Sequence, residues 1–153
     1  GMPVYVLTLH IGLGTFQPIQ VEDLTQHLIH REFYQIPAVT WQAACHDKLG
    51  PRLAVGTTTL RALEDAFSQS PFPALGKSFQ TDAQLFIYPP AHFKAVDLLL
   101  TNFHLPRSTL LCLVAAFLSP GKTEGVDWIK ALYQEALARG YRFYSYGDAM
   151  LIV

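Results

Sequence analysis

The sequence is short of cysteine and of charge, and both shortages limit the kind of protein it encodes. It has two cysteines in 153 residues, and 15% of its residues are charged. Cys45 and Cys112 lie in no CxxC pattern, which favours buried free thiols over a disulfide or a zinc site. The net charge of −1 provides no general attraction to nucleic acid, so nucleic-acid binding would need a local patch of charge.

Long hydrophobic runs are also missing. The longest, at residues 110–118, falls far short of the roughly 20 residues of a membrane helix. The amino-terminal GMPVYVLTLH lacks the basic region of a signal peptide. We therefore expect a cytoplasmic protein without a membrane partner. Half of the residues are hydrophobic, which favours a compact fold, and the length suits a single α/β domain over 1–153.

Apolar runs and turn residues predict an alternation of strands and helices. Helices are expected near residues 21–29, 40–48, 57–67, 108–117 and 126–137, and short buried strands near 4–9, 33–36, 53–55, 85–88, 95–100 and 149–153. Because short apolar strands alternate with helices, we expect an α/β fold with a layered, mostly parallel sheet and flanking helices.

The stretch AVGTTTLRAL at residues 54–63 predicts a strand, a tight turn and a helix start. Backbone N–H groups at such a start, aided by the hydroxyls of Thr57 and Thr58, suit an anionic group. A plain N-cap threonine is the alternative. Because the stretch has neither a Walker lysine nor a full GxGxxG pattern, its residues alone favour the plain cap.

Several histidines stand where chemistry is possible. In LHIGLGTF, at residues 9–16, His10 lies beside a glycine pair, which indicates either a close approach of backbone to a ligand or a simple turn. His27 and His30 are spaced i, i+3 on a possible helix with Glu32 nearby. No third ligand follows at a diagnostic spacing, so a metal is the less favoured interpretation.

The seam between two apolar runs, TNFHLPRSTLL at residues 101–111, is unusually polar. A strand that ends in the run from Asp97 to His104 would place several side chains, Asp97 and Asn102 among them, at its carboxyl end, where parallel α/β folds bind ligands. A purely structural explanation needs only Pro106 and Ser108, the latter as a helix cap. The additional Asn102 and His104 therefore favour a functional site.

Five long strings of the sequence occur together, in this order and at similar spacing, in one known protein family. They are LHIGLGTFQPIQVED, HLIHREFYQIP, AVGTTTLRALE, LFIYPPAHFKAVDLLLTNFHLPRSTLLCLVAAF and YRFYSYGDAMLIV. The family is that of the S-adenosylmethionine:tRNA ribosyltransferase-isomerases of queuosine biosynthesis, and the chain resembles its C-terminal half. The resemblance implies part of a barrel-like α/β domain, without the family's N-terminal half and inserted β-barrel.

The resemblance also implies a reaction. The ribosyl group of S-adenosylmethionine would be transferred to 7-aminomethyl-7-deazaguanine in tRNA and isomerised, which gives epoxyqueuosine-tRNA, adenine and methionine. S-adenosylmethionine would then be a consumed substrate, and no permanently bound cofactor is expected. Such a reaction needs a base beside the sulfonium, an acid for departing adenine, and contacts to ribose and to tRNA phosphate.

Motif positions suggest which residues meet these needs. Candidate acid–base groups are His10, His30 and His104. Expected substrate contacts are Gly12, Gly14, Thr15, Glu32, Thr57, Thr58, Arg61, Asp97, Thr101, Asn102, Arg107, Ser108 and Asp148. In that set, an anionic group would be held by Thr57, Thr58 and Arg61, ribose or an amine by Asn102 and Asp148, and a phosphate by Arg107.

Two hypotheses of different classes follow. The first is an enzyme half that works with a chain carrying the family's N-terminal half. The second is a non-catalytic, truncated domain that associates with itself through the surface left by that half. The 50% hydrophobic content motivates the second.

The resemblance gives one direct test of the polar seam. Replacing His104 with alanine is expected to abolish turnover in a full-length or reconstituted enzyme while the fold stays intact. Unchanged turnover would remove His104 from the catalytic candidates.

Overall fold

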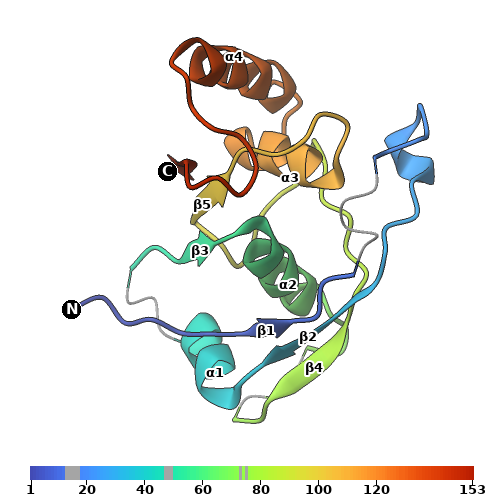
Figure 1. Cartoon of the computed structure of the whole chain (residues 1–153). Helices are drawn as coiled ribbons and strands as arrows, with labels where there is room; N and C mark the ends of the chain where they lie inside the picture. Colours follow the sequence, from blue (N-terminus) through green and yellow to red (C-terminus); the bar gives the residue numbers. More distant parts are fainter. Residues whose placement is uncertain (13–17, 47–49, 73, 75) are drawn as a thin grey trace.

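The computed structural model describes residues 1–12, 18–46, 50–72, 74 and 76–153 (Figure 1). The described chain forms two three-stranded sheets, one with the order β1-β2-β4 and one with the order β3-β5-β6. The strands are β1 Thr8–Leu9, β2 Glu32–Ile36, β3 Leu53–Val55, β4 Phe79–Ala83, β5 Leu98–Asn102 and β6 Ala149–Ile152. The helices are the 3-10 turn η2 Leu24–Gln26 and the α-helices α1 Ala38–His46, α2 Thr57–Phe67, α3 Thr109–Leu118 and α4 Gly125–Ala138.

The first sheet is antiparallel throughout, because β2 pairs in opposite directions with both β1 and β4. Side chains alternate along β2, so Tyr34 and Ile36 point inward and are fully buried. They pack with Trp41 of α1 and with Ala62 and Ala66 of α2. One sheet face and two helices therefore make the first of two cores.

The second sheet contains the parallel pair, β3 with β5, while β6 runs antiparallel to β5. Its inward residues Ala54 and Leu99 pack against Leu60 of α2 and Val114 of α3. The α/β class is thus confirmed, but the expectation of a mostly parallel sheet is wrong. Two helices, α3 and α4, separate β5 from β6. The second helix brings the chain back to the carboxyl end of β5, so β6 returns in the opposite direction.

Helix α2 is the element that the two cores share, and Figure 1 shows it between the two sheets. Leu63 and Phe67 of this helix pack against both cores. The predicted start at the Gly-Thr-Thr-Thr stretch is confirmed, with Gly56 at the N-cap position in a left-handed conformation (φ 93°) that glycine adopts readily.

Buried charges line one side of α2 and hold distant backbone. The Glu64 carboxylate accepts hydrogen bonds from the backbone N–H groups of Lys94, Ala95 and Val96 at 2.9–3.1 Å. The Asp65 carboxylate accepts from the N–H groups of Gln84 and Leu85, each at 2.9 Å, and from the Tyr34 hydroxyl at 2.9 Å.

These contacts explain two errors in the predicted strands. A strand was expected at residues 85–88, but the N–H groups of Gln84 and Leu85 bind Asp65 instead of a neighbouring strand, and the strand is β4, at Phe79–Ala83. A second strand was expected to start at residue 95, but it begins at Leu98, after the N–H groups that Glu64 holds.

The amino-terminal third also differs from the sequence-based expectation. Of the strand expected at residues 4–9, only Thr8–Leu9 pairs with β2. Of the helix expected at residues 21–29, one 3-10 turn forms, capped by the Asp23 carboxylate, which accepts from the N–H of Thr25. Helices α3 and α4 form where expected, and Ser108 caps α3 by accepting from the N–H of Leu111 at 3.1 Å. Among the described residues, no helix combines the length and apolarity needed to cross a membrane.

The Glu64 contacts predict a large effect on stability. Replacing Glu64 with alanine leaves three backbone N–H groups without their acceptor, and we expect the free energy of unfolding to fall by about 3 kcal/mol or more. Urea unfolding of the chain measures this change. The matched control is Glu135→Ala in α4, where an exposed ion pair with Arg139 is lost and the unfolding midpoint should stay near that of the wild type. Equal midpoints for the two variants would contradict the role given to Glu64.

Candidate substrate site

The carboxyl ends of β3 and β5 lie side by side, because the two strands are parallel and Val55 is opposite Leu100. Each strand leads into a helix, β3 into α2 through Gly56 and β5 into α3 through the Ser108 cap. The N–H of Gly56 donates to the carbonyl of Leu100 at 2.8 Å and fixes the first of these turns against β5. Two helix starts, each with outward N–H groups and the positive end of a helix dipole, therefore face the same edge.

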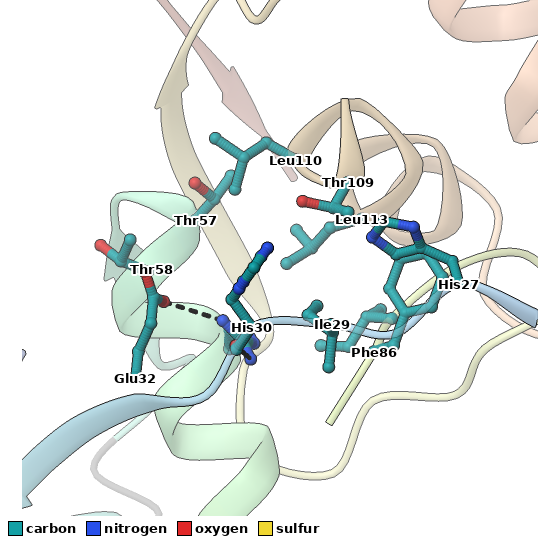
Figure 2. A pocket seen from close by; sticks show the side chains of 12 residues that line it. His27, Ile29, His30, Glu32, Thr57, Thr58, Phe86, Thr109, Leu110 and Leu113 are labelled. Atoms are coloured by element: carbon teal, nitrogen blue, oxygen red, sulfur yellow. Dashed lines mark hydrogen bonds and ion pairs between the residues drawn. The ribbon is translucent and has the colours of Figure 1, made fainter. Parts of the chain in front are cut away.

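A pocket lies between these helix starts and the segment that leads into β2 (Figure 2). From the helices it is lined by Thr57, Thr58, Arg61, Thr109, Leu110 and Leu113, and from the rest of the chain by His27, Ile29, His30, Glu32, Phe86 and Ile87. Its volume of about 20 Å³ is room for one water molecule. The site brings together three threonine hydroxyls, two helix starts and two histidines.

His30 stands in the middle of this pocket. Figure 2 shows its imidazole with Thr58 on one side and Thr109 on the other, while the His27 ring lies at the far side against Phe86. The His27 and Phe86 ring centroids are 5.2 Å apart. His30 is exposed at the surface. Of the three candidate acid–base histidines, it is the one that lines the pocket.

Arg61 and Glu32 form a buried ion pair in the pocket wall, with 2.8 Å between Arg61 Nη1 and Glu32 Oε2. The other Arg61 hydrogen bonds go to the backbone carbonyls of Leu85 (3.0 Å), His30 (2.9 Å) and Ala83 (3.2 Å). Burial lowers the pKa of Arg61, and the nearby carboxylates of Glu32 and Asp65 oppose that effect. Arg61 is therefore engaged with the protein itself, and it holds the carbonyl of His30 and the carboxylate of Glu32, on either side of Arg31.

His104 lies apart from this pocket, between β5 and α4. Its Nε2 is 2.9 Å from Thr101 Oγ1, and its backbone N–H donates to the Tyr133 hydroxyl at 2.8 Å. The side chain is 7% exposed, and burial lowers the pKa of His104 to about 4. The imidazole is therefore neutral at pH 7 and packed. The expectation that alanine here leaves the fold intact does not agree with these contacts.

Asp97 lies at the opposite end of β5 from Asn102, which corrects the expectation that both stand at the carboxyl end. It precedes Leu98, and its carboxylate accepts from the backbone N–H of Arg52 at 2.8 Å and from Arg52 Nε at 3.3 Å. Since a strand advances about 3.3 Å per residue, the length of β5 separates Asp97 from the helix starts.

Asn102 and Asp148 both hold the loop that precedes β6. The Asn102 side-chain amide donates to the carbonyl of Tyr144 at 2.8 Å. The Asp148 carboxylate accepts from the backbone N–H of Arg142 at 2.6 Å and from its guanidinium at 3.0 and 3.1 Å, and these bonds lower the pKa of Asp148. Both residues stand at the carboxyl end of β5, since Asn102 pairs with Ala149.

The remaining predicted residues lie elsewhere. His10 is exposed, with its ring centroid 5.5 Å from that of Phe33, and the neighbouring Gly12 is exposed as well. Arg107 is exposed and lines a broader cleft of about 720 Å³ together with Cys112 and residues 18–22 and 24. Two further predicted residues, Gly14 and Thr15, lie outside the described residues.

Sequence reasoning placed five of the twelve lining residues in a site and missed the other seven, which are His27, Ile29, Phe86, Ile87, Thr109, Leu110 and Leu113. Thr109 had a local signal, because it directly follows the predicted Ser108 cap, as Thr57 directly follows Gly56. Phe86 had none, since it was placed in a strand that does not form. Among the described residues, no group of three or more His, Cys, Asp or Glu side chains is arranged to hold a metal ion.

The fold and the pocket define an α/β protein with a pocket at the carboxyl ends of neighbouring parallel strands, where such folds bind ligands. The family model described as queuosine biosynthesis protein matches residues 1–152. The chain therefore belongs to the queuosine biosynthesis protein family.

Individual relatives agree with this assignment. An S-adenosylmethionine:tRNA ribosyltransferase-isomerase from Geobacter sulfurreducens is 50% identical over 154 residues, which cover 99% of this chain and 42% of the relative. A second such protein, from Thermotoga maritima, is 47% identical, and the match covers 43% of its length. The crystal structure of S-adenosylmethionine tRNA ribosyltransferase from Thermotoga maritima superposes with a TM-score of 0.67 at 47% identity, over 82% of this chain and 41% of that one. The chain thus spans about two fifths of the length of these relatives.

The environment of His104 predicts a specific dependence of stability on pH. Its pKa is about 4 in the folded chain and 6.5 in an exposed histidine. The unfolded chain therefore binds the extra proton first, and His104 destabilises the fold as the pH falls from 6.5 to 4. We expect this loss to reach about 3 kcal/mol, and to be absent from His104→Asn. Urea unfolding at pH 7 and near pH 4 measures it.

Tyr133→Phe is the matched control for this measurement. It removes the hydroxyl that accepts from the His104 backbone N–H and keeps the imidazole. This variant should be less stable than the wild type at both pH values and should keep the wild-type dependence on pH. An equal pH dependence in His104→Asn and the wild type would contradict the assignment of a neutral, buried imidazole.

Proposed function

We propose that this chain is the site-bearing portion of an S-adenosylmethionine:tRNA ribosyltransferase-isomerase. In this proposal it helps to transfer the ribosyl group of S-adenosylmethionine to 7-aminomethyl-7-deazaguanine in tRNA and to isomerise it, with release of adenine and methionine. The observation that carries the proposal is the convergence of two helix starts, three threonines and His30 on one pocket.

The two helix starts suit the negatively charged end of S-adenosylmethionine, the ribosyl donor. S-adenosylmethionine has a carboxylate on its methionine part, and outward N–H groups with neighbouring hydroxyls bind carboxylates well. Thr57, Thr58 and Thr109 supply such hydroxyls around the pocket. Arg61 contributes indirectly in this proposal, because its charge is paired with Glu32 and its guanidinium holds the carbonyl of His30.

His30 is the residue we assign as the base. The reaction requires removal of a proton next to the sulfonium, and imidazole is the side chain that most often carries out such a transfer. His30 is exposed and stands between the threonines of both helices, so a ligand on the helix starts would lie against its ring. His104 becomes a positioning residue, because it is buried against Thr101 and Tyr133 at the base of the same loop that carries Ser108.

The size of the pocket indicates that the site needs further walls. Sites that enclose a ligand of drug size have volumes of roughly 300–1,000 Å³. The pocket has about 20 Å³, so this chain offers one wall of a nucleoside site. The relatives are more than twice as long as the matched segment, and we assign the other walls to a portion that corresponds to the part of these relatives outside that segment.

Exposed arginines are our candidates for contact with tRNA phosphate. Arg31 directly follows His30 and is exposed, and Arg107 is exposed in the turn before α3. Arginine binds phosphate through parallel N–H donors, and such contacts position an RNA without reading its sequence. Individual contacts of this kind suit a chain whose net charge is −1.

A second candidate function is a non-catalytic domain that associates with itself. Exposed aliphatic side chains favour it, among them Leu28 (88% exposed) and Val55 (63% exposed). Such a domain would show no turnover with any partner, which separates it from the proposed enzyme.

Release of adenine tests the proposal directly. The chain is mixed with the portion of the Geobacter sulfurreducens relative that lies outside the matched 154 residues, with S-adenosylmethionine and precursor tRNA. We expect adenine, measured by chromatography, to appear only when both polypeptides are present. A stable mixture of the two that releases no adenine would contradict the proposed activity.

In the same assay, replacing His30 with alanine should lower the rate of adenine release by about 100-fold or more, the usual contribution of a general base. The control is His92→Ala, since His92 is exposed and does not line the pocket. It should react like the wild type. A His30→Ala variant that keeps the wild-type rate would remove His30 from the mechanism.

A further inference from the structure

The loop between α4 and β6 carries three exposed tyrosines within six residues. Tyr141, Tyr144 and Tyr146 are 45%, 44% and 69% exposed. They belong to the string YRFYSYG at residues 141–147, which we call the tyrosine loop. A single exposed aromatic side chain is ordinary, whereas a group of them on one short loop is typical of a contact surface.

The tyrosine loop is anchored to the fold. The ring centroid of Phe143, in the middle of the loop, lies 5.0 Å from that of Phe103 and 5.3 Å from that of Tyr133. The Arg142 guanidinium donates to the Asp148 carboxylate at 3.0 and 3.1 Å and so ties the two ends of the loop together. The exposed rings therefore stand on a loop with a fixed course.

Tyr144 has a strained backbone. Its φ is 67°, in the left-handed region that bulky residues rarely adopt and that glycine adopts readily. Hydrogen bonds hold it there, because its N–H donates to the carbonyl of Phe103 at 2.9 Å and its carbonyl accepts from the Asn102 amide at 2.8 Å. Strain of this kind gathers at binding and active sites. A tyrosine where glycine fits without strain indicates that a ring is used at this position.

The tyrosine loop lies at the edge of the sheet that carries the candidate site. Asn102, which holds the loop, is the last residue of β5 and pairs with Ala149 at the start of β6. Figure 1 shows the loop, in red, passing beside β5 on its way from α4 to the C-terminus. The starts of α2 and α3 face this same carboxyl edge, so the exposed rings border the candidate site.

The chemistry of the loop suits nucleobases better than phosphates. Its one cation, Arg142, is paired with Asp148, so the loop offers no net charge to a phosphate. Tyrosine rings are flat, apolar on their faces and rigid. Unpaired bases of RNA stack on such rings with little dependence on sequence, because every base has a π-face.

We infer that the tyrosine loop is a stacking surface for unpaired bases of the RNA substrate. The inference deepens the proposed function and rests on it for the choice of RNA. Base contacts belong to Tyr144 and Tyr146 in this assignment, while phosphate contacts remain with the exposed arginines. An RNA loop held in this way would present its unpaired bases at the strand edge where the helix starts bind the donor.

Binding of RNA to the chain tests the inference without S-adenosylmethionine. The probes are a labelled RNA hairpin with an unpaired loop and a fully paired RNA duplex of the same length, and fluorescence anisotropy measures their affinities. We expect the chain to bind the hairpin more tightly than the duplex. Tyr146→Ala should weaken hairpin binding about fivefold or more, the usual effect of losing one stacked ring, and Tyr146→Phe should bind like the wild type.

The matched control is Tyr5→Ala. Tyr5 is 44% exposed and precedes β1 of the first sheet, so this variant should bind the hairpin like the wild type. Salt separates stacking from charge. Because stacking involves no phosphate, the ratio of the wild-type and Tyr146→Ala affinities should be the same at low and high salt, although both affinities fall as salt rises.

Tyr144→Gly separates binding from folding. Glycine adopts a φ of 67° without strain, so the midpoint of urea unfolding should stay near that of the wild type or rise. The ring is lost, so hairpin binding should weaken about fivefold or more. A variant that loses stability and keeps its affinity would show that the tyrosine serves the fold alone.

Four further outcomes would overturn the inference. In one, the chain binds hairpin and duplex equally, or neither. In another, the folded Tyr146→Ala variant binds the hairpin as tightly as the wild type. In the third, the chain forms a dimer that Tyr146→Ala dissociates, as measured by light scattering, which assigns the loop to a second copy. In the fourth, the portion of the Geobacter sulfurreducens relative outside the matched segment binds the chain and abolishes hairpin binding.

The two proposals fail separately. Hairpin binding that depends on Tyr146, in a mixture that releases no adenine, would leave the stacking surface in place and contradict the proposed activity alone. Adenine release from precursor tRNA at the wild-type rate by Tyr146→Ala and Tyr144→Gly, with unchanged RNA affinity, would remove the stacking surface and leave the proposed activity in place.

Discussion

The buried charges of α2 are the constraint on which the rest of the structure depends. Within five residues, Arg61, Glu64 and Asp65 reach the backbone of segments that are far away in the sequence. Burying a charge is costly unless its hydrogen bonds are satisfied. Here the carboxylates accept hydrogen bonds from backbone N–H groups of loops that have no strand partner. The buried carboxylates and the unpaired N–H groups therefore satisfy each other's need for a hydrogen-bond partner. The loops are held without regular structure, and α2 can lie between two sheets.

The same constraint connects the core to the candidate site. Arg61 binds the carbonyl of His30 and the carboxylate of Glu32, on either side of Arg31, and so sets the course of the chain where it passes the helix starts. The pocket is thereby attached to the buried centre of the molecule. The packing around α2 places the threonines of two helices and one histidine at the same edge. Few additional residues are therefore needed to position the candidate site.

Local signals predicted much of the architecture. Gly56 and Ser108 marked the starts of α2 and α3 correctly, because a helix start depends on residues within one turn. The strand at 85–88 and the position of Asp97 were wrong. Both errors arose where backbone or side chain found its partner far away, in Asp65 for the first and in Arg52 for the second. Such pairings leave no trace in a window of neighbouring residues.

The sequence by itself determined the α/β class, the helix starts and the motifs that identify the family, since each depends on residue types at short spacing. Tertiary structure decided which polar residues share a site. The motifs made His30 and His104 equal candidates for acid–base catalysis. His30 lies among the threonines at the helix starts, whereas His104 is buried against Thr101 of β5. The reason is that β5 and its turn place His104 against α4, while Arg61, from another helix, directs the chain at His30 into the pocket.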